Sequence, residues 1–429
     1  MKTRHLVAAA ALAMPLASAA AFAADAPAAP AAPAAWADTL KIGAQLDAGI
    51  TANPASPTNH LNYGSLYGDR ANTPVINQAL LSIGRPVDPK ATDYDYGFKL
   101  QGIYGTDGRY THDAYLFDHF TRGQYQPGIL EASVTAFTPV LTEGGINWQV
   151  GMFPTLLGFE TIDTSTNPFY SHSYIYNFGL PVKHTGFNAI VHATDALDIY
   201  AGVDVGNQTI IGKDNNHSLA FLGGLKYTFS DSFSVLALTH YGAEDPQRFL
   251  NSYGKYDANK YYRAYNDVLI TYKMSDAVTF TTELNYIKDD FSGLFSKSGA
   301  ALAGEAKGIA QYVAYTLNDI VTVNARGELF NDNRGLFVSS FNSSTGAQQY
   351  LQGNPSVSFA NSAFGYNSTY AALTLGATFK PTMPEKFSDI TTLIRPEVRV
   401  DHVVGGPARF NNGTDRNALT AAVDVVFTY

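Results

Sequence analysis

The sequence contains no cysteine, which excludes a disulfide framework and any metal site built on thiolates. Charged residues are scarce, at 15% of the chain. Long apolar runs are also missing: apolar residues reach 45%, yet beyond residue 36 they rarely follow one another for more than about four or five positions. A chain of this length would ordinarily form two or three soluble domains, whose cores cluster apolar residues. The composition argues against that organisation.

The one longer apolar stretch lies at the N-terminus. Lys2 and Arg4 precede an apolar segment at 6–16, and residues 21–23 fit a small-x-small cleavage site. This order is typical of a secretory signal peptide, and the segment is shorter than the roughly 20 residues of a transmembrane helix. A retained anchor helix is the alternative. We expect a signal peptide over 1–24, an Ala/Pro-rich linker over 25–36 and the mature fold over 37–429.

The charge balance narrows the possible partners. Removing the two positive charges of Lys2 and Arg4 from the net charge of −9 leaves −11. An acidic surface argues against a nucleic-acid partner. The ten histidines are scattered without the spacing of a metal site, so we expect neither a metal nor a cofactor.

The dominant pattern has a period of two residues. In 40–50 every even position is apolar, whereas the odd positions hold Lys, Gly, Gln and Asp, as in a strand with one apolar and one polar face. Most such segments have the nine or more residues that a tilted strand needs to cross a bilayer. Sixteen segments follow the pattern: 40–50, 76–86, 94–104, 129–140, 146–154, 182–194, 197–207, 217–229, 233–244, 263–274, 278–288, 307–317, 321–332, 366–380, 390–403 and 417–429.

The connections alternate between short and long. Three of the short turns, within 227–232, 272–277 and 315–320, repeat one pattern that begins with Tyr and ends in a polar reversal. Long polar connections alternate with them, which is the layout of outer-membrane barrels with short periplasmic turns. In hydrocarbon a sheet must close to pair every backbone group, and sixteen strands enclose water. We therefore predict an all-β fold, a transmembrane antiparallel up-and-down β-barrel of about 16 strands.

The last strand carries an assembly signal. In 419–429 the odd positions are apolar, and Phe427 and Tyr429 are aromatic. A terminal aromatic strand looks like the signal read by the bacterial barrel-assembly machinery. We expect the protein to reside in the outer membrane of a Gram-negative cell, with membrane lipid and that machinery as partners, as a monomer or a trimer.

Charged residues gather on the face opposite to the apolar one. In 395–401 four charges of alternating sign share a face, and Pro396 takes the other, where we expect a bulge that shifts the register. A membrane strand tolerates this only if the charged face is wet, although an exposed face of a soluble sheet would look similar. The predicted lumen charges are Lys99, Glu131, Asp198, Asp204, Lys226, Asp267, Lys273, Glu283, Arg326, Glu328, Arg395, Glu397, Arg399 and Asp401.

The third long loop, 155–181, is the predicted constriction. Folded into the barrel, it would set Glu160 and Asp163 against basic wall residues across a narrow gap, and the resulting field would filter solutes by size and charge. The alternative is that the loop lies outside the barrel, where these carboxylates would face solvent or accept hydrogen bonds within turns. The candidate constriction residues are Glu160, Asp163, Arg326, Glu328, Arg395, Glu397, Arg399 and Asp401.

An enzymatic function has weaker support. Ser171 and His172 are neighbours, but adjacent side chains on an extended chain point apart. No Gly-x-Ser-x-Gly elbow or metalloprotease helix motif is present. We predict that the protein is not an enzyme, with a barrel-embedded ester or phospholipid hydrolase as an alternative.

Two stretches carry a more specific motif. One covers the fifth predicted strand to the start of the sixth, and the other the thirteenth strand. The first holds Gly151-Met152-Phe153-Pro154, Gly158-Phe159-Glu160, Asn167, Tyr170-Ser171, Ser173-Tyr174, Pro181 and His184-Thr185-Gly186, and the second Arg326-Gly327-Glu328-Leu329-Phe330-Asn331-Asp332 with Gly335.

These motifs resemble the core signature of the OmpL-like β-barrel porin family. The resemblance implies a single-chain outer-membrane barrel that acts as a channel. The family signature has Arg where His172 stands here. The resemblance and the periodicity together predict a porin with a water-filled channel for passive diffusion of small polar solutes or ions. A structural or adhesive surface barrel, with a plugged lumen and active loops, is the other alternative.

Overall fold

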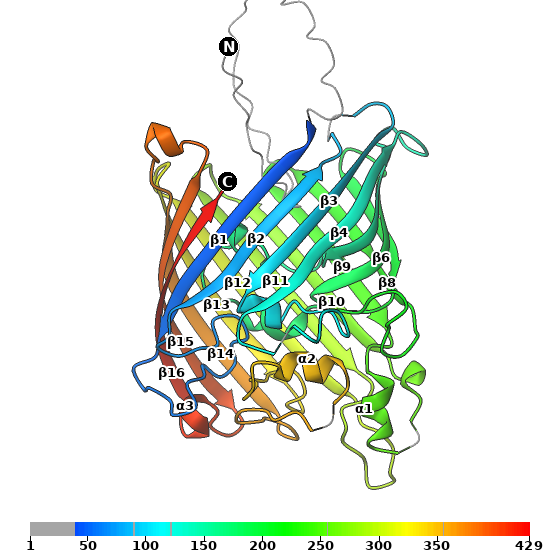
Figure 1. Ribbon diagram of the computed structural model, residues 1–429, viewed down its shortest axis with the longest axis vertical. Helices are drawn as coiled ribbons and strands as arrows, with labels where there is room; N and C mark the ends of the chain where they lie inside the picture. Colours follow the sequence, from blue (N-terminus) through cyan, green and yellow to red (C-terminus); the bar gives the residue numbers. More distant parts are fainter. Residues whose placement is uncertain (1–38, 89–90, 121, 255, 355) are drawn as a thin grey trace, which may run out of the picture.

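The protein folds as one closed barrel of sixteen antiparallel strands (Figure 1). The structure, a computed structural model, describes residues 39–88, 91–120, 122–254, 256–354 and 356–429, so the expected signal peptide and linker lie outside the described residues. Each strand pairs with its sequence neighbours, and β1 pairs with β16. The strands are β1 (Lys41–Ala52), β2 (Val75–Arg85), β3 (Asp95–Gly105), β4 (Gln126–Thr138), β5 (Ile146–Pro154), β6 (Lys183–His192), β7 (Leu197–Asp204), β8 (Ala220–Ser230), β9 (Phe233–Gly242), β10 (Arg263–Lys273), β11 (Val278–Asp289), β12 (Gly304–Thr316), β13 (Val321–Asp332), β14 (Ser368–Phe379), β15 (Thr391–Gly405) and β16 (Asn417–Thr428).

The alternation of side chains explains this architecture. In β15 the charged residues of 395–401 point inward and are buried, whereas Val398 and Val400 point outward and are exposed, as the surface facing lipid requires. All sixteen predicted strands are confirmed within a few residues at their ends. The bulge expected at Pro396 is wrong: β15 pairs with β16 without interruption from Thr391 to His402. Instead, Pro396 does not pair with a residue of β14. Proline has no backbone N–H and so cannot donate a hydrogen bond to that neighbouring strand.

The two rims of the barrel differ in their connections. Figure 1 shows the short turns, the start of β1 and the end of β16 at one rim, and the long connections at the other. No helix in the described ranges is long and apolar enough to cross a membrane. The helices are short: α1 (Gln247–Asn251), α2 (Gly346–Leu351), α3 (Phe410–Gly413), a π-helix at Ile175–Gly179, and 3-10 turns at Asp107–Arg109, Thr164–Thr166, Ala258–Lys260 and Glu385–Phe387.

Several of the long connections turn back into the barrel, whereas the connection that holds α1 and the one after β11 extend beyond the rim and pack on each other (Figure 1). Figure 1 shows coils and short helices in the half of the lumen next to the long-loop rim. Five of the long connections contribute to one large buried cluster that also includes inward-facing strand residues. The main core of this protein thus lies inside its ring of strands. Loop members of the cluster include Tyr63, Tyr67, Tyr110, Leu157, Phe169, Tyr174, Ile175, Tyr176, Phe178, Leu180, Val338 and Phe341.

Candidate functional site

The constriction loop, residues 155–182 between β5 and β6, crosses the lumen. On one side of the barrel Ile162 accepts a hydrogen bond from the Gln78 side chain of β2 at 2.7 Å. On another, the carbonyl of Gly179 accepts one from Asn285 of β11 at 3.0 Å. Because β2 and β11 are far apart around the ring, the loop spans the barrel interior. The sequence left two arrangements possible, a loop inside the lumen or a loop outside it. The structure shows the loop inside the lumen.

Glu160 is the most enclosed charge of the constriction loop. Its carboxylate accepts hydrogen bonds from Arg326 of β13 at 2.7 Å, from the His172 ring at 2.8 Å and from the Ser173 backbone N–H at 3.0 Å. The Tyr312 hydroxyl of β12 donates a further bond at 3.1 Å. Burial would raise the pKa of Glu160, but Arg326 and His172 outweigh it and lower the pKa to about 2. The carboxylate is therefore ionised at any physiological pH.

Arg326 fixes the loop to β13. Beyond its bond to Glu160, its guanidinium donates to the Ser171 carbonyl at 2.8 Å and to the Ser171 hydroxyl at 3.0 Å. It also donates to Thr374 of β14 at 3.2 Å and forms an ion pair with Glu328 at 2.8 Å. Its side chain is wholly buried. All three guanidinium nitrogens contact oxygen atoms, so Arg326 holds the loop and does not face open solvent.

Glu328 and Arg399 extend this network to β15. Glu328 accepts from the Tyr174 backbone N–H at 2.7 Å and from Arg399 at 2.9 Å. Arg399 also donates to the His172 carbonyl at 3.2 Å and binds Asp401 at 2.8 Å. Asp401 in turn accepts from the Tyr174 hydroxyl at 3.0 Å. Each wall charge thus bonds both to its neighbours and to the loop.

The remaining wall charges bind loop backbone. Arg395 donates to the carbonyls of Thr164 at 2.5 Å and Asn167 at 2.7 Å, and it forms an ion pair with Asp424 of β16. Glu397 accepts from the N–H groups of Tyr170 at 3.0 Å and Ser171 at 3.1 Å. Because these bonds go to backbone groups, they fix the path of the loop independently of the side chains that the loop carries. We call the set Glu160, Arg326, Glu328, Arg395, Glu397, Arg399 and Asp401 the ionic clamp.

The structure differs from the expected constriction in two respects. Asp163 forms no ion pair among the described residues; its carboxylate accepts from the Ser165 N–H at 3.0 Å and so caps the turn Thr164–Thr166. Nor is there a gap between Glu160 and the basic wall, because its carboxylate touches Arg326. Opposed charges in contact neutralise one another. They position the loop and do not create a field across an open passage.

The opposite wall holds the constriction loop by apolar contact. Strands β6 to β9 turn large apolar side chains into the lumen, where polar ones are the rule for a channel. These side chains belong to the same buried cluster as Leu157, Phe178 and Leu180 of the loop. The loop thus bridges two chemically different walls. We call Ile190, Tyr200, Leu222, Leu236 and Leu238 the apolar wall.

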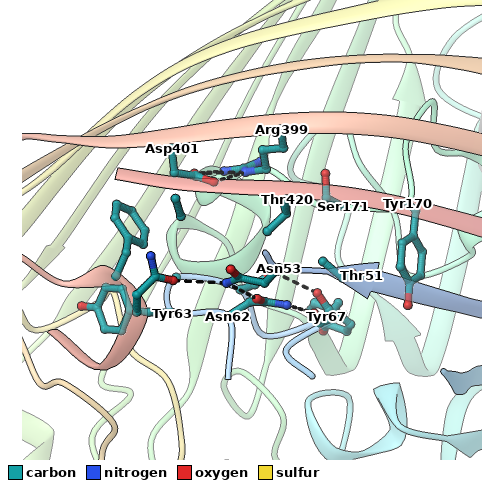
Figure 2. A pocket seen from close by; sticks show the side chains of 16 residues that line it. Thr51, Asn53, Asn62, Tyr63, Tyr67, Tyr170, Ser171, Arg399, Asp401 and Thr420 are labelled. Atoms are coloured by element: carbon teal, nitrogen blue, oxygen red, sulfur yellow. Dashed lines mark hydrogen bonds and ion pairs between the residues drawn. The ribbon is translucent and has the colours of Figure 1, made fainter. Parts of the chain in front are cut away.

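A small cavity remains beside the constriction loop on the long-loop side (Figure 2). Tyr170 and Ser171 of the loop, Arg399 of β15, and Tyr63 and Tyr67 of the connection after β1 contribute to its lining. Its volume of about 30 Å³ exceeds by only a few-fold the roughly 10–15 Å³ that one water requires. The cavity therefore has room for a few water molecules beside the loop.

Ser171 and His172 do not form a catalytic pair. The Ser171 hydroxyl is bound by Arg326 at 3.0 Å, whereas the His172 ring faces Glu160 at 2.8 Å and stacks on Tyr176. Both residues thus serve to hold the loop. A nucleophile requires a base within hydrogen-bond reach, and the neighbouring ring is directed elsewhere.

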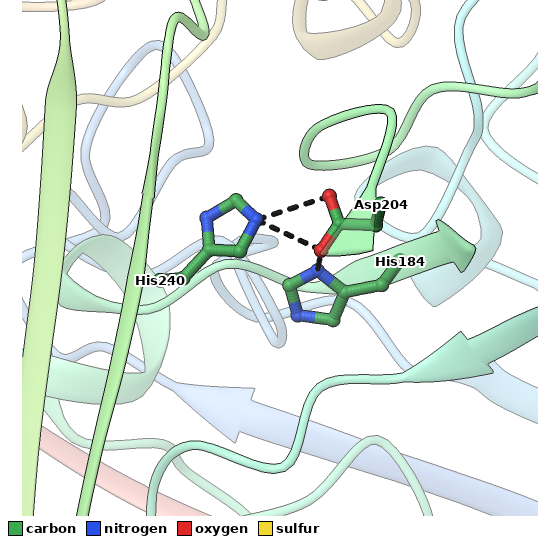
Figure 3. Close-up of side chains that lie close together, drawn as sticks. All are labelled: His184, Asp204 and His240. Carbon is green, nitrogen blue, oxygen red and sulfur yellow. Dashed lines mark hydrogen bonds and ion pairs between the residues drawn. The ribbon is translucent and has the colours of Figure 1, made fainter. Parts of the chain in front are cut away.

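One buried cluster was missed by the sequence analysis. His184 of β6, Asp204 of β7 and His240 of β9 meet at the lumen wall near the long-loop rim (Figure 3). Asp204 pairs with Ala220 of β8, whose short side chain leaves room for contact across that strand. The inward parity of the three positions was a usable signal. Their meeting depends on strand register, which the scattered histidine spacing does not reveal.

Nearly the whole described chain matches a known protein family. The sequence profile of the family described as "Putative beta-barrel porin-2, OmpL-like" matches residues 39–429. None of the curated proteins compared with the chain matches it. Solved structures with a similar fold include the outer-membrane channel DcaP of Acinetobacter baumannii, with 12% identity, a TM-score of 0.53 and coverage of 91% of this chain and 97% of the other.

Two further structures share the fold at low identity. OmpT of Vibrio cholerae in its trimer form is 11% identical, with a TM-score of 0.53 and coverage of 91% of this chain and 99% of the other. The anion-selective porin from Comamonas acidovorans is 9% identical, with a TM-score of 0.54 and the same two coverages. Such identities support the barrel architecture alone.

Proposed function

Because the chain belongs to the OmpL-like family of β-barrel porins, we propose that it is a narrow channel whose conductance is limited by the constriction loop. The family and the closed sixteen-stranded barrel identify it as an outer-membrane porin. The proposal concerns the width of the channel and what passes through it. It differs from a wide general pore, in which the loop leaves an open passage.

The observation that carries the proposal is the seating of the loop on both walls. The ionic clamp binds it to β13 and β15, and the apolar wall packs against its other edge. Buried ion pairs are costly to break singly, because the partner left behind is an unpaired charge in a dry site. Solute flow past the loop therefore requires either a very narrow path or displacement of the loop.

We infer that the permeant species are small polar solutes or ions that diffuse passively. Towards the short-turn rim, the inward side chains are charged and partly exposed, among them Lys99 of β3, Asp198 of β7 and Lys273 of β10. A wet, mixed-charge vestibule favours hydrated solutes over apolar ones. Passive diffusion through it requires no cofactor.

Single-channel recording in planar bilayers tests the proposal. The intact protein should give ohmic channels of small conductance, and a variant with 160–174 replaced by a short Gly/Ser linker should give a markedly larger one. A solute panel of increasing size should show a cut-off that rises in the variant. Equal conductance in both proteins would remove the constriction loop as the limiting element, and silence in both would refute channel function.

A structural or adhesive role is the second candidate, because the filled half of the lumen is what a plugged barrel predicts. Tyr63 and Val338, from loops far apart in sequence, are joined by a hydrogen bond of 3.2 Å inside the barrel. Deleting 341–359 should change solute permeation if the protein is a channel. Loss of surface attachment with unchanged permeation would favour the second role.

We propose further that the protein has no hydrolase activity and that Phe427 and Tyr429 form the assembly signal. Phe427 faces outward on β16, and Tyr429 pairs through its backbone with Ala44 of β1 at 2.8 Å. A chain with Ala at both positions should accumulate before insertion into membrane lipid. Cross-linking of purified protein in detergent distinguishes a monomer from a trimer.

A further inference from the structure

His184, Asp204 and His240 converge on one point of the lumen wall. The Nδ1 atom of His184 and the Nε2 atom of His240 each lie 3.1 Å from the same carboxylate oxygen, Oδ2 of Asp204 (Figure 3). One ligand atom from each residue lies within 4.8 Å of the others. Around a tetrahedral zinc ion with bonds of about 2.0–2.2 Å, neighbouring ligand atoms are roughly 3.3 Å apart. The two separations from Asp204 are close to this value, and the two histidine nitrogens lie within 4.8 Å of each other.

The three side chains are shielded from solvent. His184 and His240 are completely buried, and Asp204 is 2% exposed. The ring of Phe153 lies 5.8 Å from that of His184, and the ring of Tyr265 lies 5.9 Å from that of His240. Aromatic walls lower the local dielectric and thereby strengthen interactions with a bound cation.

Each histidine has an oxygen next to the ring nitrogen that faces away from Asp204. For His184, Nε2 lies 3.0 Å from the Thr155 hydroxyl. For His240, Nδ1 lies 3.6 Å from the Glu244 carboxylate. Histidines that bind metals use the second ring nitrogen in this way, since an oxygen there fixes the tautomer and the orientation of the ring.

Hydrogen bonds within the protein satisfy the cluster only in part. His240 Nε2 bonds to Asp204, but the Nδ1 atoms of His184 and His240 and one oxygen of Glu244 are buried in ionic contact alone, without a hydrogen bond among the described residues. A neutral histidine has one N–H, yet both ring nitrogens of His240 face carboxylates. A cation coordinated between His184, Asp204 and His240 would resolve both features.

We propose that His184, Asp204 and His240 bind a divalent transition-metal ion, with Thr155 and Glu244 orienting the two histidines. Imidazole ligands favour Zn²⁺, Ni²⁺ or Cu²⁺, whereas Ca²⁺ and Mg²⁺ select all-oxygen sites. Three protein ligands leave a fourth position for water. The proposal does not depend on what the channel transports.

The place of the site defines what the ion would do. It joins β6, β7 and β9 at the point where the constriction loop enters and leaves the wall, since Thr155 donates its backbone N–H to Val182 at 3.0 Å. Glu244 also accepts from the Asn207 N–H at 2.9 Å, which ties two further loops to the same point. A bound ion would therefore fix the base of the loop on the apolar side.

Metal titration of the full protein in detergent micelles tests the proposal. After removal of metals with EDTA, Zn²⁺ is titrated calorimetrically, and Co²⁺ is added separately because its visible absorption reports four-coordinate geometry. We expect one equivalent of each ion. The variants are H184Q, H240Q, D204N and E244Q, with H192Q as the matched control, because His192 is a lumen-wall histidine beside a single carboxylate, Asp198, at 2.7 Å.

The variants separate ligands from orienting residues. H184Q, H240Q and D204N should weaken Zn²⁺ binding by more than about 100-fold, and E244Q by roughly 10- to 100-fold, the usual loss for an outer-shell partner. H192Q should bind as the parent does. Absence of saturable binding in the parent, or equal binding in H240Q and H192Q, would overturn the proposal. If D204N fails to form the heat-resistant barrel on electrophoresis, the two histidine variants decide.

Discussion

The two walls that hold the constriction loop differ in how the loop could be released from them. On β13 and β15 the ionic clamp binds the loop through charge-assisted hydrogen bonds, each with a defined partner and direction. On β6 to β9 the apolar wall packs against it without direction. Losing one partner of a buried ion pair strands the other, whereas losing part of an apolar side chain leaves a cavity that neighbours can partly fill. The clamp should therefore behave as a switch and the apolar wall as a graded support.

A single cysteine can report on both walls, because the natural chain has none. Ser173 is completely buried and donates its backbone N–H to Glu160. In a Ser173→Cys variant, the rate of reaction with a maleimide measures how often the loop leaves its seat. A change of about 1.4 kcal/mol in the free energy of seating alters that rate tenfold.

The largest effect is expected from Arg326→Ala in the reporter background. It leaves Glu160 and Glu328 buried without their common partner, at a cost of about 3–5 kcal/mol, so labelling should accelerate by about 100- to 5,000-fold. Lys273→Ala, which removes another lumen-facing cation, should leave the rate unchanged. A similar rate for both variants would contradict the clamp.

Acidification should release the loop only at very low pH. The pKa of Glu160 is lowered from its ordinary 4.5 to about 2, so its ionised form stabilises the seated loop fully above pH 4.5. That stabilisation, about 3 kcal/mol, is lost as the pH falls from 4.5 towards 2. Conductance should stay constant from pH 7 to 4.5 and rise below that. The Glu160→Gln variant should lack this rise; an unchanged profile would remove Glu160 as its source.

A smaller effect is expected on the apolar wall. Leu222→Ala removes a buried side chain of the cluster, and because the lumen can repack, we expect the low end of the usual range, about 2 kcal/mol, or about 30-fold faster labelling. Leu225→Ala, on the outer face of the same strand, is the matched control. If Leu222→Ala equals Arg326→Ala, the two walls do not differ as described.

The smallest effect is expected from Asp163→Ala. It removes the cap of the turn Thr164–Thr166, worth about 1 kcal/mol, and should accelerate labelling about fivefold. Asp257→Ala removes the same kind of cap from the turn Ala258–Lys260 outside the constriction loop and should have no effect. An effect of Asp163→Ala as large as that of Arg326→Ala would mean that Asp163 belongs to the clamp.

The sequence predicted the ring of strands because a period of two follows directly from the geometry of a strand in a bilayer. It also identified Glu160 and the wall charges from Arg326 to Asp401 as belonging together. It could not show that they touch, since the gap between a loop and a wall depends on the path of the loop backbone. That path is fixed by bonds such as Arg395 to the Asn167 carbonyl, which do not depend on side-chain identity in the loop.

The apolar wall was harder to anticipate. Leu222 and Leu238 lie at inward positions of strands whose outward positions are equally apolar, so alternation gives no contrast there. The cluster of His184, Asp204 and His240 was missed for a related reason. Its members come from three strands, and only the register that places Asp204 opposite Ala220 brings them together.

The pairing of β1 with β16 has a consequence for membrane insertion. The first strand of the ring pairs with the last, so the sheet cannot close until both strands are in place. A ring without β16 would present two unpaired strand edges to hydrocarbon, which lipid does not tolerate. Closure of the sheet and entry into the bilayer are therefore coupled by geometry.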